Sequence, residues 1–271
     1  MKSNITAYVI ITVLALIFGV GDRVYAESET AKFPEGKWID LTHDFSTETV
    51  YWPTGEGFKL EKVYEGHTEK GYFYTANKYE GEEHGGTHID APIHFAEGRQ
   101  TVDEIPIEKV TGTAVVIDIS GKALSDPDYQ VSAADFTAWE KENGRIPENS
   151  IVLLNTGYAR YWPDRVKYMG TDKKGREAVK ELHFPGLDPE AAKWLVRNRK
   201  INAIGLDTPS IDYGQSELFE SHQILFEENI PAFENVANLD KLPATGAYVI
   251  ALPMKIKGGS GGPLRIIALV P

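Results

Sequence analysis

The sequence predicts a single α/β domain in which helices pack on one mixed sheet. Three observations support this fold class. Strand-like and helix-like segments alternate through the middle of the chain, strand-like segments gather towards both ends, and no repeat or low-complexity linker divides the chain. The composition is that of a globular protein, with 42% hydrophobic and 25% charged residues, and a length of 271 residues is sufficient for one large domain.

The expected strands are segments rich in β-branched and aromatic residues, and several of them are apolar throughout. They lie at residues 37–45, 57–64, 72–80, 113–120, 150–157, 201–208, 247–256 and 263–270. The last two flank the sequence KGGSGGP. This glycine-rich stretch lacks the Lys-Ser/Thr ending of a phosphate-binding loop and precedes a strand, so it predicts a hairpin connection.

Three helices are expected, at residues 132–144, at residues 188–200 and from Ser216 onwards. Ser132 and Asp135 have the spacing of a capping box, and Gly144 is typical of a helix end. Asp188 followed by Pro189 is an equally favourable helix start.

The first 26 residues predict a secretory signal peptide. Lys2 precedes an apolar run at residues 8–18, and the small-residue sequence VYA ends at Ala26. We therefore expect cleavage after Ala26, a mature domain at residues 27–271, and a secreted or periplasmic protein without stable membrane insertion. The alternative is that the segment is retained as an anchor, although the apolar run is short for spanning a bilayer.

The charge and the cysteine content exclude several functions. The formal net charge is −12, and such an acidic surface repels phosphate backbones, so no nucleic-acid partner is expected. The chain has no cysteine, which excludes disulfides, thiolate metal sites and cysteine nucleophiles. Any metal ion must therefore be held by histidine and carboxylate side chains.

The stretch EEHGGTHIDAPIHF, residues 82–95, concentrates three of the seven histidines and an aspartate. Its glycines and proline disfavour a helix, whereas an extended chain alternates its side chains between two faces. The even-numbered face then presents the four polar side chains of His84, His88, Asp90 and His94. The other face is mostly apolar and suits a core, and Gly86 would leave room for an ion.

A metal site explains this polar face better than a hydrogen-bonded patch does. Crowded imidazoles disfavour one another's protonation unless a cation compensates. A catalytic metal needs protein ligands and an open position for water, which His84, His88 and Asp90 would provide. His94 lies one step further along the same face, where it would exchange protons with that water.

The histidine-rich stretch resembles the signature of a known family. HGGTHIDAPIH resembles the HxGTHxDxPxH signature of the cyclase family of metal-dependent hydrolases, which includes bacterial kynurenine formamidase and isatin hydrolase. Further segments that resemble the family are WIDLTHDF with VYWPTGEG, IGLDTPSID, HQILFEENIPAFENVANLDKL and GGSGGPLRIIAL. The resemblance therefore covers most of the chain that follows residue 26.

The resemblance implies a swivelling β/β/α fold and one or two divalent ions, most often Zn or Mn. It implies that His84, His88 and Asp90 bind the first ion, and that His222 and Glu234, twelve residues apart, bind the second. Asp90 and Glu234 would then bridge the two ions, His94 would donate and accept protons, and Trp52 would lie against the substrate ring. These ligand roles, like a homodimer or homotetramer, are expectations from the family.

Two further aspartates follow a buried strand, where the ligand-facing residues of α/β sheets commonly lie. They are Asp207 and Asp212, and we expect them to orient imidazoles.

The expected function is hydrolysis of an amide-type C–N bond in a small aromatic substrate, either an aryl formamide, as in arylformamidases, or a cyclic amide. One alternative is a lactone or ester hydrolase with the same site. The other is a catalytically silent periplasmic protein that binds a metal or a small ligand. His94 separates these classes, because a protein that only stores metal needs no proton shuttle.

Overall fold

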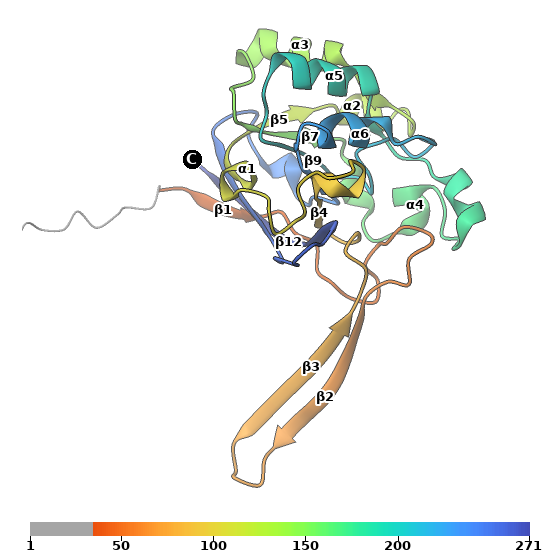
Figure 1. The fold of residues 1–271 in the computed structure, drawn as a ribbon, viewed down its shortest axis with the longest axis vertical. Helices are drawn as coiled ribbons and strands as arrows, with labels where there is room; N and C mark the ends of the chain where they lie inside the picture. The colour runs from red at the N-terminus through yellow and green to blue at the C-terminus, as the bar shows by residue number, and fades with distance from the viewer. Residues whose placement is uncertain (1–34) are drawn as a thin grey trace, which may run out of the picture. The chain divides into compact units, whose positions relative to one another are not determined.

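A mixed sheet that closes on itself is the centre of the computed structural model, which describes residues 35–271 (Figure 1). The strand order is β1-β12-β11-β5-β7-β9-β10-β4, and β4 pairs also with β12. The strands of this barrel are β1 Lys37–Asp40, β4 His88–Asp90, β5 Thr111–Asp118, β7 Ile151–Asn155, β9 Ala203–Leu206, β10 Ala232–Glu234, β11 Ala247–Pro253 and β12 Gly261–Val270. The expected signal peptide lies outside the described residues.

The sheet is mixed, as the sequence predicts. β5, β7, β9 and β10 run parallel to one another, whereas β1, β4, β11 and β12 make antiparallel pairs. The predicted hairpin between β11 and β12 is confirmed. β4 lies within the stretch that the sequence predicts to be extended, but the sequence did not predict that it pairs with both β10 and β12 and so closes the barrel. The strand expected at residues 37–45 ends at Asp40.

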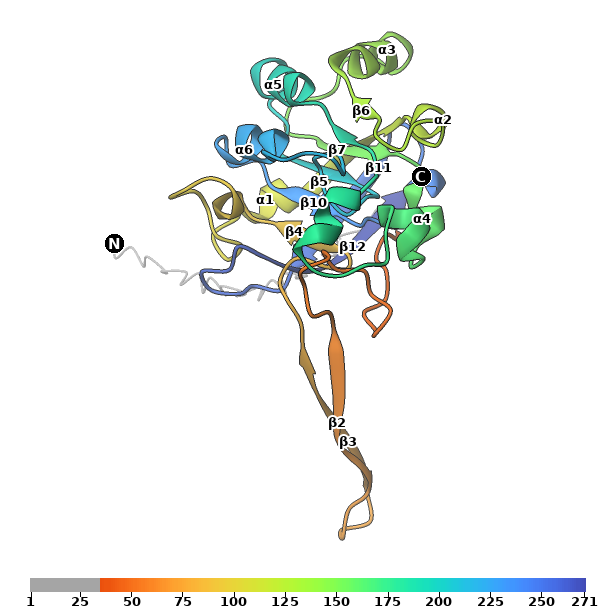
Figure 2. The same ribbon diagram turned by 90° about the vertical axis from the view of Figure 1, so that its right-hand side faces the viewer.

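Two smaller sheets lie outside the barrel. β2 Lys59–His67 and β3 Phe73–Glu80 pair only with each other and form a long hairpin that projects from the barrel (Figure 2). β6 Gln130–Val131 and β8 Gly186–Leu187 form a short parallel pair. We refer to residues 59–80 as the arm.

The helices are short and lie around the barrel. They are α1 Ile107–Val110, α2 Ser120–Ala123, α3 Ala133–Asn143, α4 Arg165–Met169, α5 Pro189–Asn198 and α6 Glu220–Phe226, with 3₁₀ turns η1 Pro92–His94, η2 Tyr158–Tyr161, η3 Arg176–Glu181 and η4 Leu239–Lys241. None of the helices in residues 35–271 has the length and apolar character that crossing a membrane requires.

The predicted helix starts are confirmed at two of three places. The backbone N–H of Ser132 donates to the Asp135 carboxylate at 2.7 Å, and Asp188 caps α5 by accepting from the backbone N–H of Glu190 at 2.7 Å. The third helix begins at Glu220 rather than at Ser216. The cause is local, because the Ser216 hydroxyl accepts from the backbone N–H of Phe219 and closes a turn before the helix.

Two apolar cores explain why the central strands are apolar throughout. One core fills the barrel and includes Val116 of β5 and Leu153 of β7. The other lies between the outside of the barrel and helices α3, α5 and α6, and it includes Val115 and Leu154. Neighbouring residues of one strand therefore point into different cores, and neither face is polar.

The pairing of β4 with β12, which closes the barrel, depends on a glycine. Gly261 of β12 lies opposite Asp90 of β4, and a Cβ atom at Gly261 would lie 2.6 Å from both His84 Cε1 and the backbone oxygen of Ile89. A glycine inside a strand commonly marks such a close approach.

We therefore expect Gly261→Ala to lower the free energy of unfolding by about 1–3 kcal/mol, because overpacking displaces β4. Urea unfolding of the purified protein measures this. Gly121→Ala is the matched control, since its added methyl group meets nothing within 4 Å, and its stability should not fall. Equal stabilities of the two variants would contradict the importance of the close approach.

Candidate metal centre

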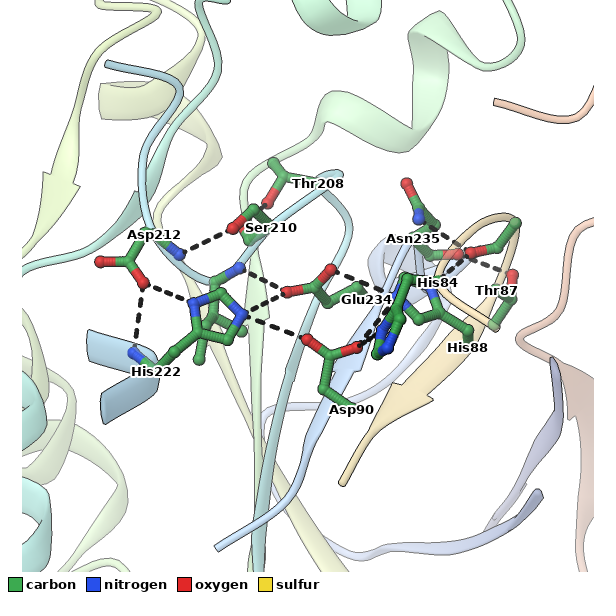
Figure 3. Close-up of polar contacts among 12 residues, drawn as sticks. His84, Thr87, His88, Asp90, Thr208, Ser210, Asp212, His222, Glu234 and Asn235 are labelled. Carbon is green, nitrogen blue, oxygen red and sulfur yellow. Dashed lines mark hydrogen bonds and ion pairs between the residues drawn. The ribbon is translucent and has the colours of Figure 1, made fainter. Parts of the chain in front are cut away.

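The candidate metal ligands converge where β4 is inserted between β10 and β12 (Figure 3). His88 and Asp90 come from β4, and Glu234 lies opposite His88 on β10. His222 comes from α6 and reaches the same point from outside the strands. The sequence places His222 more than a hundred residues from β4, and the expected approach of its side chain is confirmed by the structure.

A first cluster contains His84, His88 and Asp90. His84 Nδ1 lies 2.7 Å and His88 Nε2 lies 3.1 Å from Asp90 Oδ1. His88 and Asp90 are buried, whereas the His84 side chain keeps 25% of its surface exposed. The first cluster therefore has one side open to the solvent.

A second cluster contains His222, Glu234 and the same aspartate. His222 Nε2 lies 3.2 Å from Asp90 Oδ2 and 3.2 Å from Glu234 Oε1. In each cluster one possible ligand atom from every residue lies within 4.8 Å of the others. Because Asp90 offers one carboxylate oxygen to each cluster, the arrangement suits two ions that share this residue.

An unpaired nitrogen supports an ion in the first cluster. The backbone oxygen of Gly86 lies 2.9 Å from His88 Nδ1, which assigns the ring proton to that nitrogen. The other nitrogen, Nε2, is buried without a hydrogen bond, and it faces Asp90 Oδ1 and Glu234 Oε2 at 3.1 and 3.5 Å. A nitrogen that faces two carboxylate oxygens needs a proton or a metal cation between them, so the residues present fit a divalent ion.

The electrostatics of the two clusters also favour a bound cation. Burial acts to lower the pKa of His88, but Asp90 and Glu234 outweigh it and raise the pKa to about 9. Burial also acts to lower the pKa of His222, which Asp212, Asp90 and Glu234 raise well above its ordinary value. The buried carboxylates therefore attract positive charge, which protons supply when no ion is bound.

The cluster does not form on the extended strand that the sequence predicts. Only residues 88–90 are strand, Gly86 has φ +59°, and His94 lies on the 3₁₀ turn η1. His84 reaches Asp90 because the chain turns back at Gly86. The expectation that Gly86 leaves room for an ion is wrong, because a Cβ there would meet the Phe45 ring at 2.7 Å.

His94 lies beside the first cluster and not in it. Its ring stacks on the ring of His84 with centroids 3.8 Å apart. Burial lowers the pKa of His94 from its ordinary value to about 4, although Asp90 acts to raise it. His94 is therefore neutral at neutral pH and has a nitrogen available to accept a proton.

Asp212 and Ser260 orient the His222 and His84 rings through the ring nitrogens that do not face Asp90. Asp212 accepts from His222 Nδ1 at 2.6 Å, as expected of an aspartate behind a ligand histidine. The Ser260 hydroxyl lies 2.8 Å from His84 Nε2 and donates to Glu83 Oε2 at 2.7 Å. No sequence pattern singles out Ser260, because the glycine-rich stretch that contains it predicts only a hairpin connection.

The expectation for Asp207 is wrong. Its carboxylate accepts from the backbone and hydroxyl of Thr156 at 2.8 and 2.6 Å and from the backbone N–H of Ala159 at 3.2 Å. Within residues 35–271 it makes no hydrogen bond to an imidazole. β9 ends at Leu206, and Asp207 is directed to the loop that follows β7, so it holds that loop in place.

Asn235 is a second residue that the sequence analysis missed. Its side chain donates to the Gly86 oxygen at 2.8 Å and accepts from the Tyr168 hydroxyl at 2.8 Å. The same Gly86 oxygen accepts from His88, so Asn235 fixes the group that orients this ring. Asn235 has φ +53°, a conformation that asparagine tolerates better than most residues. Its position directly after the expected ligand Glu234 is the feature of the sequence that could have pointed to it.

A cavity of about 290 Å³ opens onto the clusters. Its apolar lining consists mainly of Val50, Tyr51, Trp52, Phe95, Pro209 and Phe219. Trp52 packs edge-on against Phe184 and Phe219, with ring centroids 6.3 and 6.2 Å apart. The cavity therefore combines aromatic walls with His84, His88, Asp90, His94 and His222 on its polar side.

Comparison with known proteins gives consistent matches. The family model described as putative cyclase matches residues 39–213. The chain is 32% identical to isatin hydrolase from Roseibium aggregatum over 246 residues, 88% of each chain, and 25% identical to kynurenine formamidase from Salinibacter ruber over 84% of this chain and 95% of that one. The solved structure of isatin hydrolase A from Ralstonia solanacearum covers 87% of this chain and 92% of its own, with 32% identity and a TM-score of 0.78.

We expect His88→Ala to lose the divalent ion of the first cluster, because that cluster then keeps only two of its three ligands. Elemental analysis of the purified variant measures the ion content. His183→Ala is the control, since His183 is a half-exposed histidine that pairs with Asp128, and its ion content should equal that of the wild type. Full ion content in the His88 variant would refute the site.

We expect Asp212→Asn to weaken ion binding by ~10–100-fold, because the amide no longer holds the His222 ring as a carboxylate does. Titration of the ion-free protein with Zn or Mn measures the affinity. Asp128→Asn is a matched control, because Asp128 contacts His183 away from the site. Unchanged affinity in the Asp212 variant would leave His222 outside the coordination sphere.

Proposed function

The chain belongs to the cyclase family of metal-dependent hydrolases, and on this premise we propose that it hydrolyses an amide-type C–N bond in a small aromatic substrate. The observation that carries the proposal is the pair of clusters that share Asp90 on one side of a cavity with aromatic walls. Amide hydrolysis needs an activated water and a proton for the leaving nitrogen, and both must be supplied beside the bound substrate.

In this proposal His84, His88 and Asp90 hold one divalent ion, and Asp90, His222 and Glu234 hold a second. Nitrogen and oxygen ligands of this kind suit Zn or Mn. When bound, such ions supply Lewis-acid chemistry, which lowers the pKa of water and polarises a carbonyl group. Asp212 and Ser260 keep the His222 and His84 rings directed at the ions through their outer nitrogens.

His94 is the proposed proton shuttle. It is neutral, it borders the cavity, and its ring lies against that of His84. It would accept the proton of the attacking water and return it to the nitrogen that leaves the carbonyl carbon. The products are a carboxylate and an amine, and for a cyclic amide both groups stay on one molecule.

The cavity suits a flat ring. The aromatic side chains of Trp52, Phe95 and Phe219 line the cavity, and a volume of about 290 Å³ is near the lower end of the usual size for a small-molecule site. The identity is higher with the isatin hydrolase than with the kynurenine formamidase, at 32% against 25%. We therefore place a cyclic amide fused to an aromatic ring first among the substrates and an aryl formamide second.

We expect His94→Ala to keep its ions and its fold while kcat falls by ~10²–10⁴, the usual contribution of general acid–base catalysis. The rate is measured on the best substrate from a panel of isatins, formanilides, lactams and lactones, and the ion content by elemental analysis.

His183→Ala again serves as the control and should keep the wild-type rate. Loss of ions from the His94 variant would make His94 a ligand, and a wild-type rate would place the shuttle elsewhere. Faster hydrolysis of lactones than of amides would favour an esterase. No hydrolysis of any compound by the fully loaded protein would indicate a protein that only binds.

A further inference from the structure

We propose that Glu83 is a positioning residue that acts through Ser260 to hold His84 as a ligand bound through Nδ1, and that it thereby sets the affinity of the first cluster for its ion. Glu83 precedes His84 in the chain, yet its carboxylate reaches the His84 ring by way of Ser260, 177 residues later. The inference rests on the first cluster of the proposed function and not on the substrate.

The direction of each hydrogen bond follows from the number of protons. Glu83 Oε2 lies 2.9 Å from the backbone nitrogen of Ser260 and 2.7 Å from its hydroxyl oxygen. Two oxygens at this distance need a proton between them, and a carboxylate has none to donate, so the Ser260 hydroxyl donates to Glu83. The hydroxyl has only one proton. Its oxygen, 2.8 Å from His84 Nε2, must therefore accept, which assigns the ring proton of His84 to Nε2.

This assignment leaves Nδ1 as the ligand nitrogen of His84. Nδ1 lies 2.7 Å from Asp90 Oδ1, and Figure 3 shows the ring directed at that carboxylate. His88 is held in the opposite way, because its Nδ1 lies against the Gly86 oxygen and its Nε2 faces Asp90. The two histidines of the first cluster therefore offer different nitrogens to the same ion.

The loop before β12 fixes the position of Ser260. The backbone oxygen of Ser260 accepts from the N–H of Ala91 at 2.8 Å, and that of Gly259 accepts from the N–H of Val102 at 2.9 Å. Gly259 also makes room for the carboxylate, because a Cβ atom there would lie 2.7 Å from Glu83 Oε1. Glu83 therefore meets a hydroxyl group whose place is set by backbone hydrogen bonds, as the support of a ligand requires.

The negative charge of Glu83 is available to the ion. The ion pairs of residues 35–271 give Glu83 no lysine or arginine partner. An acceptor behind a ligand histidine orients the ring and raises the basicity of the ligand nitrogen, and a chain of hydrogen bonds transmits such polarisation. His84 depends on this support more than His88 does, because 25% of its side chain is exposed, against 3% for His88.

The first test is titration of the ion-free protein with zinc in competition with a chromophoric chelator. Glu83→Gln keeps the shape of the side chain and an accepting oxygen but removes the charge. We expect it to weaken the binding of one zinc ion by ~10-fold, and Ser260→Ala to weaken it at least as much. Glu82→Gln is the matched control, because the Glu82 carboxylate accepts from the backbone N–H of Gly57 near the base of the arm, and its affinity should equal that of the wild type.

Unchanged affinity in the Glu83 variant would overturn the proposal, and so would an equal loss in the Glu82 variant, which would show a general effect of charge. A wild type that binds no zinc would overturn both this proposal and the proposed function. Because no substrate is used, a zinc-loaded protein that hydrolyses nothing would count against the proposed function alone.

The double variant tests whether Glu83 acts through Ser260. If it does, adding Glu83→Gln to Ser260→Ala lowers the affinity no further, whereas independent effects would multiply. Multiplied losses would overturn the relay. Urea unfolding of the ion-free proteins is measured in parallel, and we expect the Glu83 variant to unfold at the wild-type urea concentration. A loss of affinity accompanied by unfolding at lower urea would make Glu83 a structural residue and reject its positioning role.

Nitrogen-15 NMR spectra of the zinc-loaded protein test the ligand atoms directly. We expect the ring proton of His84 on Nε2 and that of His88 on Nδ1. The signals of each ring are assigned from their absence in His84→Gln and in His88→Gln. A His84 ring that carries its proton on Nδ1 in the zinc-loaded protein would overturn the proposal.

Discussion

The double pairing of β4 is the constraint on which both the fold and the candidate site depend. These three residues pair with β10 on one side and β12 on the other, and without them the sheet would stay open. The same pairing sets His88 opposite Glu234 and holds Asp90 between two neighbouring strands. The backbone hydrogen bonds that close the barrel therefore also fix His88, Asp90 and Glu234, on strands rather than on loops.

The candidate metal centre contains charged side chains that are costly to bury. Asp90, Glu234 and two imidazoles are almost fully buried, and burial of ionised groups is unfavourable unless they are paired. The surrounding hydrogen bonds reduce this cost only in part, because His88 Nε2 keeps no partner. A divalent ion would compensate the charge of the carboxylates and bind this nitrogen at the same time, so the groups that are costly to bury are also the ones that would hold the ion.

The sequence predicted those parts of the molecule that follow from local chemistry. The capping pair of Ser132 and Asp135, the buried strands and the histidine-rich motif each depend on residues close together in the chain. His222 and Glu234 were found only through resemblance to the family, because no local pattern relates them to His88.

The failures arise where tertiary structure overrides a local pattern. The expected strand through residues 84–94 is interrupted, because the turn at Gly86 packs against Phe45 and brings His84 back to Asp90. Asp207 and Asp212 stand in equivalent sequence contexts, yet only Asp212 meets an imidazole, since the chain changes direction between them. Ser260 and Asn235 act through hydrogen bonds to distant segments.

Sharing Asp90 between the two clusters means that an ion in one cluster changes the free energy of binding an ion in the other, by the same amount in both directions. The two ions would then behave as one thermodynamically linked pair, and a chelator would remove them together if the coupling is favourable and in two separate steps if it is unfavourable.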